Sequence, residues 1–213
     1  SESADEPESS RRAVTCRHNS SMFRCVSIEA SGSVLDKNLA ALSVVSQRAA
    51  RAIAQTTSRT DLEWTVADDG LISCAFTDAW GRKTSLASRK RPGEEAKRLA
   101  EAVDIDKAGV VIIKGFGCGH HIRALLEQGK SAALIVVYEP DVALLRSVLE
   151  RQDFSGWLVD PLVAFITDPD DAAVISETFS GSEGLVSLGL KLVEHPPSSK
   201  RLADTTDRFE ARL

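Results

Sequence analysis

The chain has 213 residues, 43% hydrophobic and 27% charged, which is enough apolar material for one α/β domain with a small subdomain attached. Its formal net charge of −5 argues against a general nucleic-acid-binding protein, and no apolar run approaches the ~20 residues of a membrane-spanning helix. The four cysteines form no C-x-x-C pair and no histidine lies at zinc-ligand spacing, so reduced thiols are expected rather than disulfides or a metal site. We therefore expect a soluble, cytoplasmic protein.

The first part of the chain predicts a flexible leader and then a small α/β subdomain. Residues 1–30 are polar and rich in Ser, Glu and Arg, a composition that is typical of poorly packed segments. The subdomain is expected at residues 31–90. Its expected elements are an amphipathic helix and the two strands of a hairpin, at residues 38–54, 62–66 and 71–76. Asp69 and Gly70 supply the turn between the two strands.

Two unbroken apolar runs begin the main domain, which is expected at residues 91–198. Residues 110–113 and 134–137 are rich in Val and Ile, which is typical of neighbouring parallel strands covered on both faces. The residues between them are a glycine-rich turn and a segment of helical character. Strand, turn, helix and strand in this order predict half of a nucleotide-binding, Rossmann-like unit with a parallel sheet flanked by helices.

The glycine-rich turn and an acid at the end of the second strand form the candidate site. Gly115, Gly117 and Gly119 allow a sharp turn and a close approach of the backbone to a ligand. The helix after the turn begins near His120, and its free amide groups suit a phosphate or carboxylate. Glu139 lies where an acid accepts hydrogen bonds from ribose hydroxyls. These five residues are the predicted cofactor-binding set.

The identity of the ligand stays open at this stage. A dinucleotide fingerprint needs its third glycine at the position of His120, which disfavours nicotinamide and flavin dinucleotides. The G-x-G-x-G spacing is similar to the first motif of S-adenosylmethionine-dependent methyltransferases, but Ile113 and Lys114 stand where those enzymes carry an acid. In a third interpretation the glycines only pack the helix on the sheet, and Glu139 only caps the next helix.

The rest of the chain continues the alternation of helix and strand. Helices are expected at residues 92–103, 141–151, 170–179 and 202–213, and strands at residues 162–167 and 185–193. The final helix runs to the last residue without a cap. We therefore interpret residues 199–213 as the start of a helix that leads to a further domain, and the chain as the N-terminal portion of a longer protein.

Several short motifs together carry a family resemblance. They are NLAAL at 38–42, LASRKRP at 86–92, GFGCGH at 115–120, YEPD at 138–141 and HP at 195–196. In this order they resemble the N-terminal domain of motility accessory factor (Maf-type) glycosyltransferases, over about residues 36 to 213.

The resemblance implies a cytoplasmic bacterial protein. Members of that family attach nonulosonic acids to serines and threonines of flagellin, from CMP-activated sugar donors, by means of a catalytic domain that follows the N-terminal one. Our first hypothesis is therefore an accessory Rossmann-like module that positions a downstream catalytic domain of the same chain, recruits the flagellin acceptor or binds a nucleotide at the glycine turn. No catalytic residue is assigned. The alternative is an S-adenosylmethionine-dependent methyltransferase-like domain, with Glu139 on the ribose.

Overall fold

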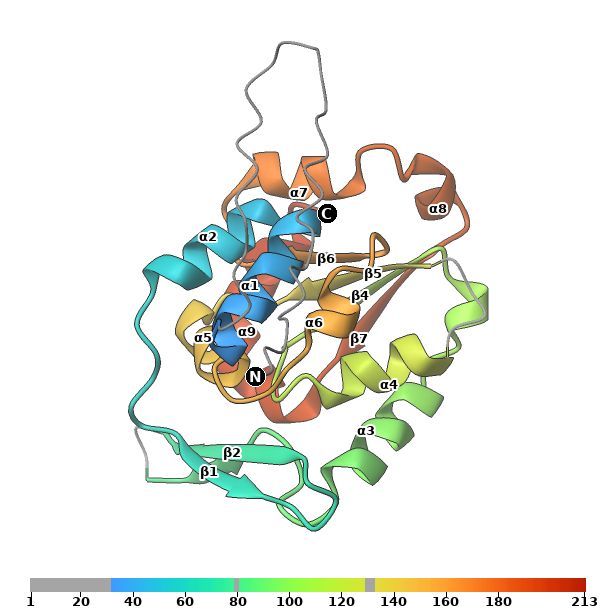
Figure 1. The fold of residues 1–213 in the computed structure, drawn as a ribbon. Helices are drawn as coiled ribbons and strands as arrows, with labels where there is room; N and C mark the ends of the chain where they lie inside the picture. Colours follow the sequence, from blue (N-terminus) through green and yellow to red (C-terminus); the bar gives the residue numbers. More distant parts are fainter. Residues whose placement is uncertain (1–31, 79–80, 129–132) are drawn as a thin grey trace, which may run out of the picture. The chain divides into compact units, whose positions relative to one another are not determined.

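A four-stranded parallel sheet forms the centre of the computed structural model, which describes residues 32–78, 81–128 and 133–213 (Figure 1). Its strands are β4 (Val110–Lys114), β5 (Leu134–Tyr138), β6 (Val163–Ile166) and β7 (Leu190–Glu194). Their order in space is β6-β5-β4-β7, with every neighbouring pair parallel. This is the strand order of a Rossmann-type half-sheet, and it confirms the predicted α/β class. The predicted leader, residues 1–30, lies outside the described residues.

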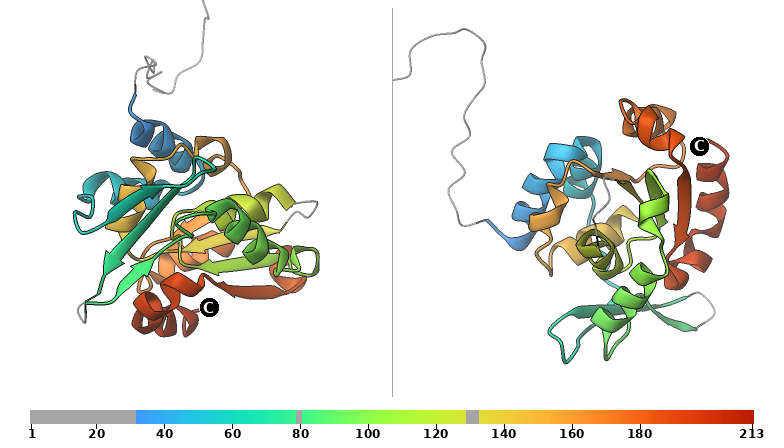
Figure 2. Two further views of the ribbon diagram at one scale, coloured as in Figure 1. Left: turned by 90° about the horizontal axis from the view of Figure 1, so that it is seen from below. Right: turned by 90° about the vertical axis from the view of Figure 1, so that its right-hand side faces the viewer.

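Both faces of the sheet are buried because side chains on each strand alternate between two hydrophobic layers. Val111 and Ile113 of β4 belong to one cluster, and Val110 and Ile112 to the other. The helices over the first face are α1 (Val34–Val45), α2 (Gln47–Gln55), α4 (His120–Gln128), α5 (Val142–Leu149) and α6 (Ser155–Leu158). Those over the second face are α7 (Ala172–Phe179) and α9 (Pro196–Glu210). The right-hand view of Figure 2 shows the sheet between these two layers.

The helix predicted over residues 38–54 is two helices, α1 and α2, which separate at Ser46. Ser46 leaves the helical region, with φ −140° and ψ 67°. Its hydroxyl accepts a hydrogen bond from the backbone amide of Phe165 at 3.0 Å. β6 is an edge strand among the described residues, so no carbonyl of a neighbouring strand is present to accept a hydrogen bond from this amide. The hydroxyl of Ser46 takes that place.

The end of the chain differs from the prediction in two places. The strand expected at residues 185–193 is a short helix, α8 (Glu183–Ser187), followed by β7, and Gly189 makes the turn between them with φ 115°. The helix expected at residues 202–213 begins six residues earlier, at Pro196. Pro196 and Pro197 are its first two residues, which is possible because proline at a first helical position needs no amide partner.

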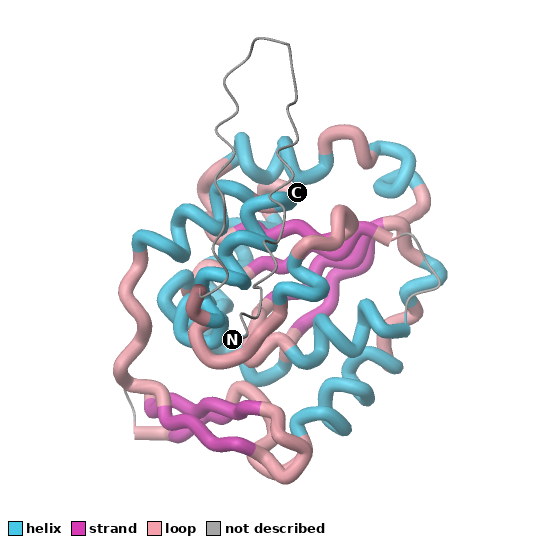
Figure 3. Tube along the Cα trace, in the orientation of Figure 1, coloured by secondary structure: helices cyan, strands magenta, loops and turns pink. Residues whose placement is uncertain are grey.

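A separate three-stranded antiparallel sheet precedes the parallel one in the chain (Figure 3). Its strands are β1 (Glu63–Val66), β2 (Ile72–Thr77) and β3 (Lys83–Ser85). The predicted hairpin is confirmed, with Gly70 in the turn at φ 77°; β3 was not predicted. Helix α3 (Pro92–Glu101) and a single 3-10 turn (Ile105–Lys107) then lead into β4. Leu86, just after β3, is fully buried in the same hydrophobic cluster as Phe116 of the glycine turn.

Candidate functional site

The glycine turn and Glu139 meet at one edge of the parallel sheet. Gly115, Gly117 and Gly119 have φ values of 108°, 51° and 78°, a region that residues with a Cβ rarely adopt. The amide of Phe116, inside the turn, donates a hydrogen bond to Oε2 of Glu139 at 3.0 Å. The structure therefore brings the three glycines and the carboxylate together at the carboxyl ends of β4 and β5.

Both carboxylate oxygens of Glu139 are already engaged within the protein. Nη1 and Nη2 of Arg201, on α9, donate to Oε1 and Oε2 at 2.9 and 2.7 Å. The amides of Asp141 and Phe116 each donate a further hydrogen bond, at 3.0 Å. Glu139 is 0% exposed. In this arrangement the carboxylate has one charged and one backbone donor on each oxygen, and no part of it faces solvent where a ribose would lie.

The start of α9 fills the space in front of the glycine turn. A Cβ on Gly117 would lie 2.4 Å from Cε1 of His195, and one on Gly115 would lie 2.5 Å from Cβ of Ser198. These glycines therefore allow the chain's own helix to approach the turn. In sheets of this strand order, ligands bind where the connections leave the strands in opposite directions, here between β4 and β7. His195 directly follows β7, so the protein occupies that position with its own side chains.

Two buried histidine rings stack beside the turn. The rings of His121 and His195 lie 4.4 Å apart between centroids and 7° from parallel. Burial lowers the pKa of His121 to about 4, and burial with the neighbouring His121 lowers the pKa of His195 to about 2. Both rings are therefore neutral at pH 7. Nδ1 of His195 lies 2.8 Å from Oγ of Ser198, but Ser198 is 0% exposed, so this pair fixes the start of α9 and is closed to a substrate.

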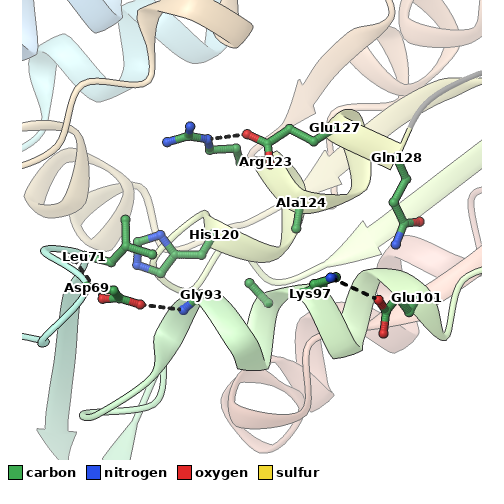
Figure 4. A pocket seen from close by; sticks show the side chains of 11 residues that line it. Asp69, Leu71, Gly93, Lys97, Glu101, His120, Arg123, Ala124, Glu127 and Gln128 are labelled. Atoms are coloured by element: carbon green, nitrogen blue, oxygen red, sulfur yellow. Dashed lines mark hydrogen bonds and ion pairs between the residues drawn. The ribbon is translucent and has the colours of Figure 1, made fainter.

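His120 faces a different part of the molecule from the other predicted residues. Its Nε2 donates to the carbonyl of Ile72 at 2.7 Å, and burial lowers its pKa. It lines a cavity of about 610 Å³ between the hairpin turn, α3 and α4 (Figure 4). The ion pairs Arg123–Glu127 and Lys97–Glu101 also lie along this cavity, so its charged side chains largely neutralise one another. The structure therefore directs the side chain of His120 into this cavity, whereas Glu139 lies at the glycine turn.

A second cavity lies between the three-stranded sheet and the start of α9, and we name it the cationic cleft. It has a volume of about 550 Å³ and is lined by Phe76, Asp78, Arg82, Lys83, Thr84, Pro196, Pro197, Lys200 and Arg201. The sequence signal for it was partial. Arg82 and Lys83 are adjacent basic residues in the sequence, but nothing local predicts that they meet a helix more than a hundred residues later.

The thiols of Cys74 and Cys118 are in contact inside the core. Their Sγ atoms lie 3.6 Å apart and each residue is 1% exposed. The contact with Cys74, together with burial, raises the pKa of the Cys118 thiol well above its usual range. A protonated, buried thiol is a poor nucleophile, so Cys118 fills space in the glycine turn.

Two further properties concern possible ligands and membranes. Across residues 32–78, 81–128 and 133–213, no group of three or more His, Cys, Asp or Glu side chains is arranged to hold a metal ion. In the same part of the chain, every helix is too short or too polar to cross a bilayer.

Comparison with solved structures finds a likeness to a Maf glycosyltransferase from Magnetospirillum magneticum AMB-1. The two share a fold. The TM-score is 0.52 at 15% sequence identity, and the match covers 84% of this chain but 34% of that one, so this chain spans about a third of the enzyme's length. No protein-family model and no curated protein matches the sequence.

Proposed function

We propose that this chain is the N-terminal, Rossmann-like accessory module of a motility accessory factor-like glycosyltransferase, and that a separate domain of the parent protein carries out the chemistry. In this proposal the parent transfers a nonulosonic acid from a CMP-linked donor to serine or threonine of flagellin in the cytoplasm. The likeness to one third of a Maf glycosyltransferase supports the proposal, because the matched region leaves most of that enzyme outside it.

The accessory role is supported chiefly by the carboxyl edge of the sheet, where the start of α9 covers the glycine turn and Glu139. An enzyme that used the edge of this sheet would leave the glycine turn and Glu139 open to its ligand. Here Arg201 holds Glu139, and His195 and Ser198 lie against Gly117 and Gly115. The contacts that would bind a nucleotide instead attach α9 to the sheet, and α9 packs over the second face, where Phe209 stacks on Tyr138 with 4.1 Å between the ring centroids.

Binding of a nucleotide or of S-adenosylmethionine at Gly115, Gly117, Gly119 and Glu139 stays a prediction, and it requires α9 to withdraw. The methyltransferase alternative gains no support from the position where those enzymes carry an acid. That position holds Lys114, a buried cation that pairs with Glu194 at 3.0 Å and Glu210 at 2.6 Å. The division of the chain at residues 30, 90 and 198 also stays a prediction.

Two measurements test the proposal: the sequence of the gene beyond the codon for Leu213, and the glycosylation activity of the full-length product. We expect the reading frame to continue past Leu213 into a catalytic domain. The purified full-length product should glycosylate flagellin when it is given a CMP-linked nonulosonic acid, and the 213-residue chain alone should not, as read by intact-protein mass spectrometry. A reading frame that stops at Leu213, or sugar transfer by the chain alone, would overturn the accessory role.

A further inference from the structure

We propose that the cationic cleft binds a small phosphate ester that carries a flat apolar ring. The cleft lies between β2 and β3 on one side and the first turn of α9 on the other. Its volume of about 550 Å³ is in the usual range for a pocket that holds one small molecule. This inference is independent of the proposed accessory role.

Positive charge is concentrated in the cleft although the chain as a whole carries a formal net charge of −5. Four cationic side chains line it, against the single carboxylate of Asp78. Lys83 is the first residue of β3 and Arg82 directly precedes it, whereas Lys200 and Arg201 come from α9. Because residues far apart in the sequence place these charges around one cavity, the cleft is a site of positive potential for an anion.

Among the described residues, three of these four cations form an ion pair and the fourth, Lys200, does not. Lys83 pairs with Glu63, which does not line the cleft, and Nε of Arg82 donates to Asp78 at 2.8 Å. Lys200 is exposed and its ammonium group forms no ion pair with any residue that the structure describes. An ammonium on a flexible side chain at the rim of a cavity is well suited to a phosphate group.

Arg201 provides a fixed positive charge in the wall of the cleft. Its two Nη atoms are held by Glu139, and its side chain is only 13% exposed. Its Nε atom is buried and has no hydrogen-bond acceptor among the described residues. Because this Nε is closed to solvent, Arg201 contributes positive charge to the wall of the cleft and no direct hydrogen bond to a ligand.

Apolar surfaces in the cleft favour a ligand with a ring over a bare phosphate ion. Phe76 lines one side and Pro196 and Pro197 the other. The guanidinium of Arg59 lies 5.2 Å from the centre of the Phe76 ring, which fixes the orientation of that ring. A flat apolar group between the phenyl ring and the proline rings would lose contact with water, while its phosphate stays among the cations.

Isothermal titration calorimetry of the whole 213-residue chain tests this proposal with three probes. Phenyl phosphate carries both parts of the expected ligand, inorganic phosphate carries only the anion, and benzyl alcohol carries only the ring. We expect phenyl phosphate to bind more tightly than inorganic phosphate, and benzyl alcohol to give no measurable heat. The affinity for phenyl phosphate should fall as salt is raised, because counterions screen the cationic side chains.

Two single variants assign the binding to the cleft. Lys200→Ala and Lys83→Ala should each weaken phenyl phosphate binding about fivefold. Lys37→Ala removes an exposed lysine of α1, outside the cleft, and should leave the affinity unchanged. Circular dichroism of each variant checks that it is folded.

Three outcomes would overturn the proposal. They are no heat from phenyl phosphate, unchanged affinity in both folded cleft variants, or inorganic phosphate binding as tightly as phenyl phosphate. Either of the first two would show that the cleft does not bind the ester, and the third would show that the apolar ring adds nothing to the affinity. None of them bears on sugar transfer by the parent protein, so failure of this inference is distinguishable from failure of the proposed function.

Discussion

Arg201 and Glu139 form a bidentate ion pair that joins α9 to the carboxyl edge of the parallel sheet. The two N–O distances are 2.9 and 2.7 Å, and the side chains are 13% and 0% exposed. The acid that the sequence marks as a ribose partner is therefore the anchor of a helix.

Arg201→Met should lower the free energy of unfolding by about 3–5 kcal/mol, because it leaves the buried carboxylate of Glu139 without its charged partner. Lys200→Met is the matched control, since Lys200 is the preceding residue on the same helix and is exposed. The control should stay within about 0.5 kcal/mol of the wild type. Urea unfolding followed by circular dichroism measures both. Equal stabilities for the two variants would show that the ion pair contributes nothing to the fold.

Gly117→Ala should destabilise the protein far more than Gly181→Ala. Both glycines have positive φ, 51° and 77°, so alanine at either costs about 1–2 kcal/mol of backbone strain. Only the Cβ at position 117 also meets a neighbour, His195 Cε1 at 2.4 Å, whereas nothing lies within 4 Å at position 181. Thermal unfolding compares the two, and the steric clash should add about 1–3 kcal/mol. Similar losses in the two variants would mean that α9 does not pack against the turn.

Stability should fall as the pH is lowered from 7.5 to 5.5. In the folded protein the pKa values of His121 and His195 are about 4 and about 2, below the ordinary value of 6.5. The unfolded chain therefore takes up protons on these histidines while the folded chain does not, so their stabilisation is complete above pH 6.5 and is lost as the pH falls.

The expected loss over this interval is about 2–3 kcal/mol for the two histidines, and the lowered pKa of His120 acts in the same direction. Urea midpoints at pH 7.5, 6.5 and 5.5 measure this loss. The range stays above the pH at which most carboxylates begin to titrate. A free energy of unfolding that is constant across this range would contradict the burial of the stacked pair. His121→Phe, which keeps an aromatic ring but cannot be protonated, should reduce the slope.

Cys118 should not react with iodoacetamide in the folded protein at pH 8. Its side chain is 1% exposed and its thiol pKa is raised by the contact with Cys74 and by burial, so the thiolate that would attack the reagent is scarce. Peptide mass spectrometry compares labelling with and without urea, and denaturation should restore normal reactivity. Rapid native labelling at Cys118 would instead identify an accessible, activated thiol in the glycine turn.

Local patterns in the sequence were sufficient for the central unit of the fold. Continuous Val and Ile runs predicted β4 and β5 as parallel neighbours, because only strands buried on both faces tolerate them. Asp69 and Gly70 predicted the hairpin turn, and the three glycines predicted a turn with positive φ. Each of these features depends on residues that are close together in the chain.

Features that depend on distant contacts were missed or placed wrongly. The break at Ser46 follows from a hydrogen bond to β6, and β3 is a short strand of Lys83–Ser85 that forms only beside β2. The final helix was expected only from residue 202, although proline also begins helices and α9 starts at Pro196. His120 was grouped with the glycines by sequence position, but the first turn of α4 directs it to another cavity.

The amino-acid sequence by itself determined the strands, the turn and the position of the acid, since periodicity and backbone sterics act over a few residues. Whether that edge of the sheet is open or closed was decided only by tertiary structure. The guanidinium that holds Glu139 comes from Arg201, 62 residues away, and the side chains against Gly115 and Gly117 come from His195 and Ser198 at the start of the same helix. Such contacts result from packing of whole elements, and no local pattern specifies them.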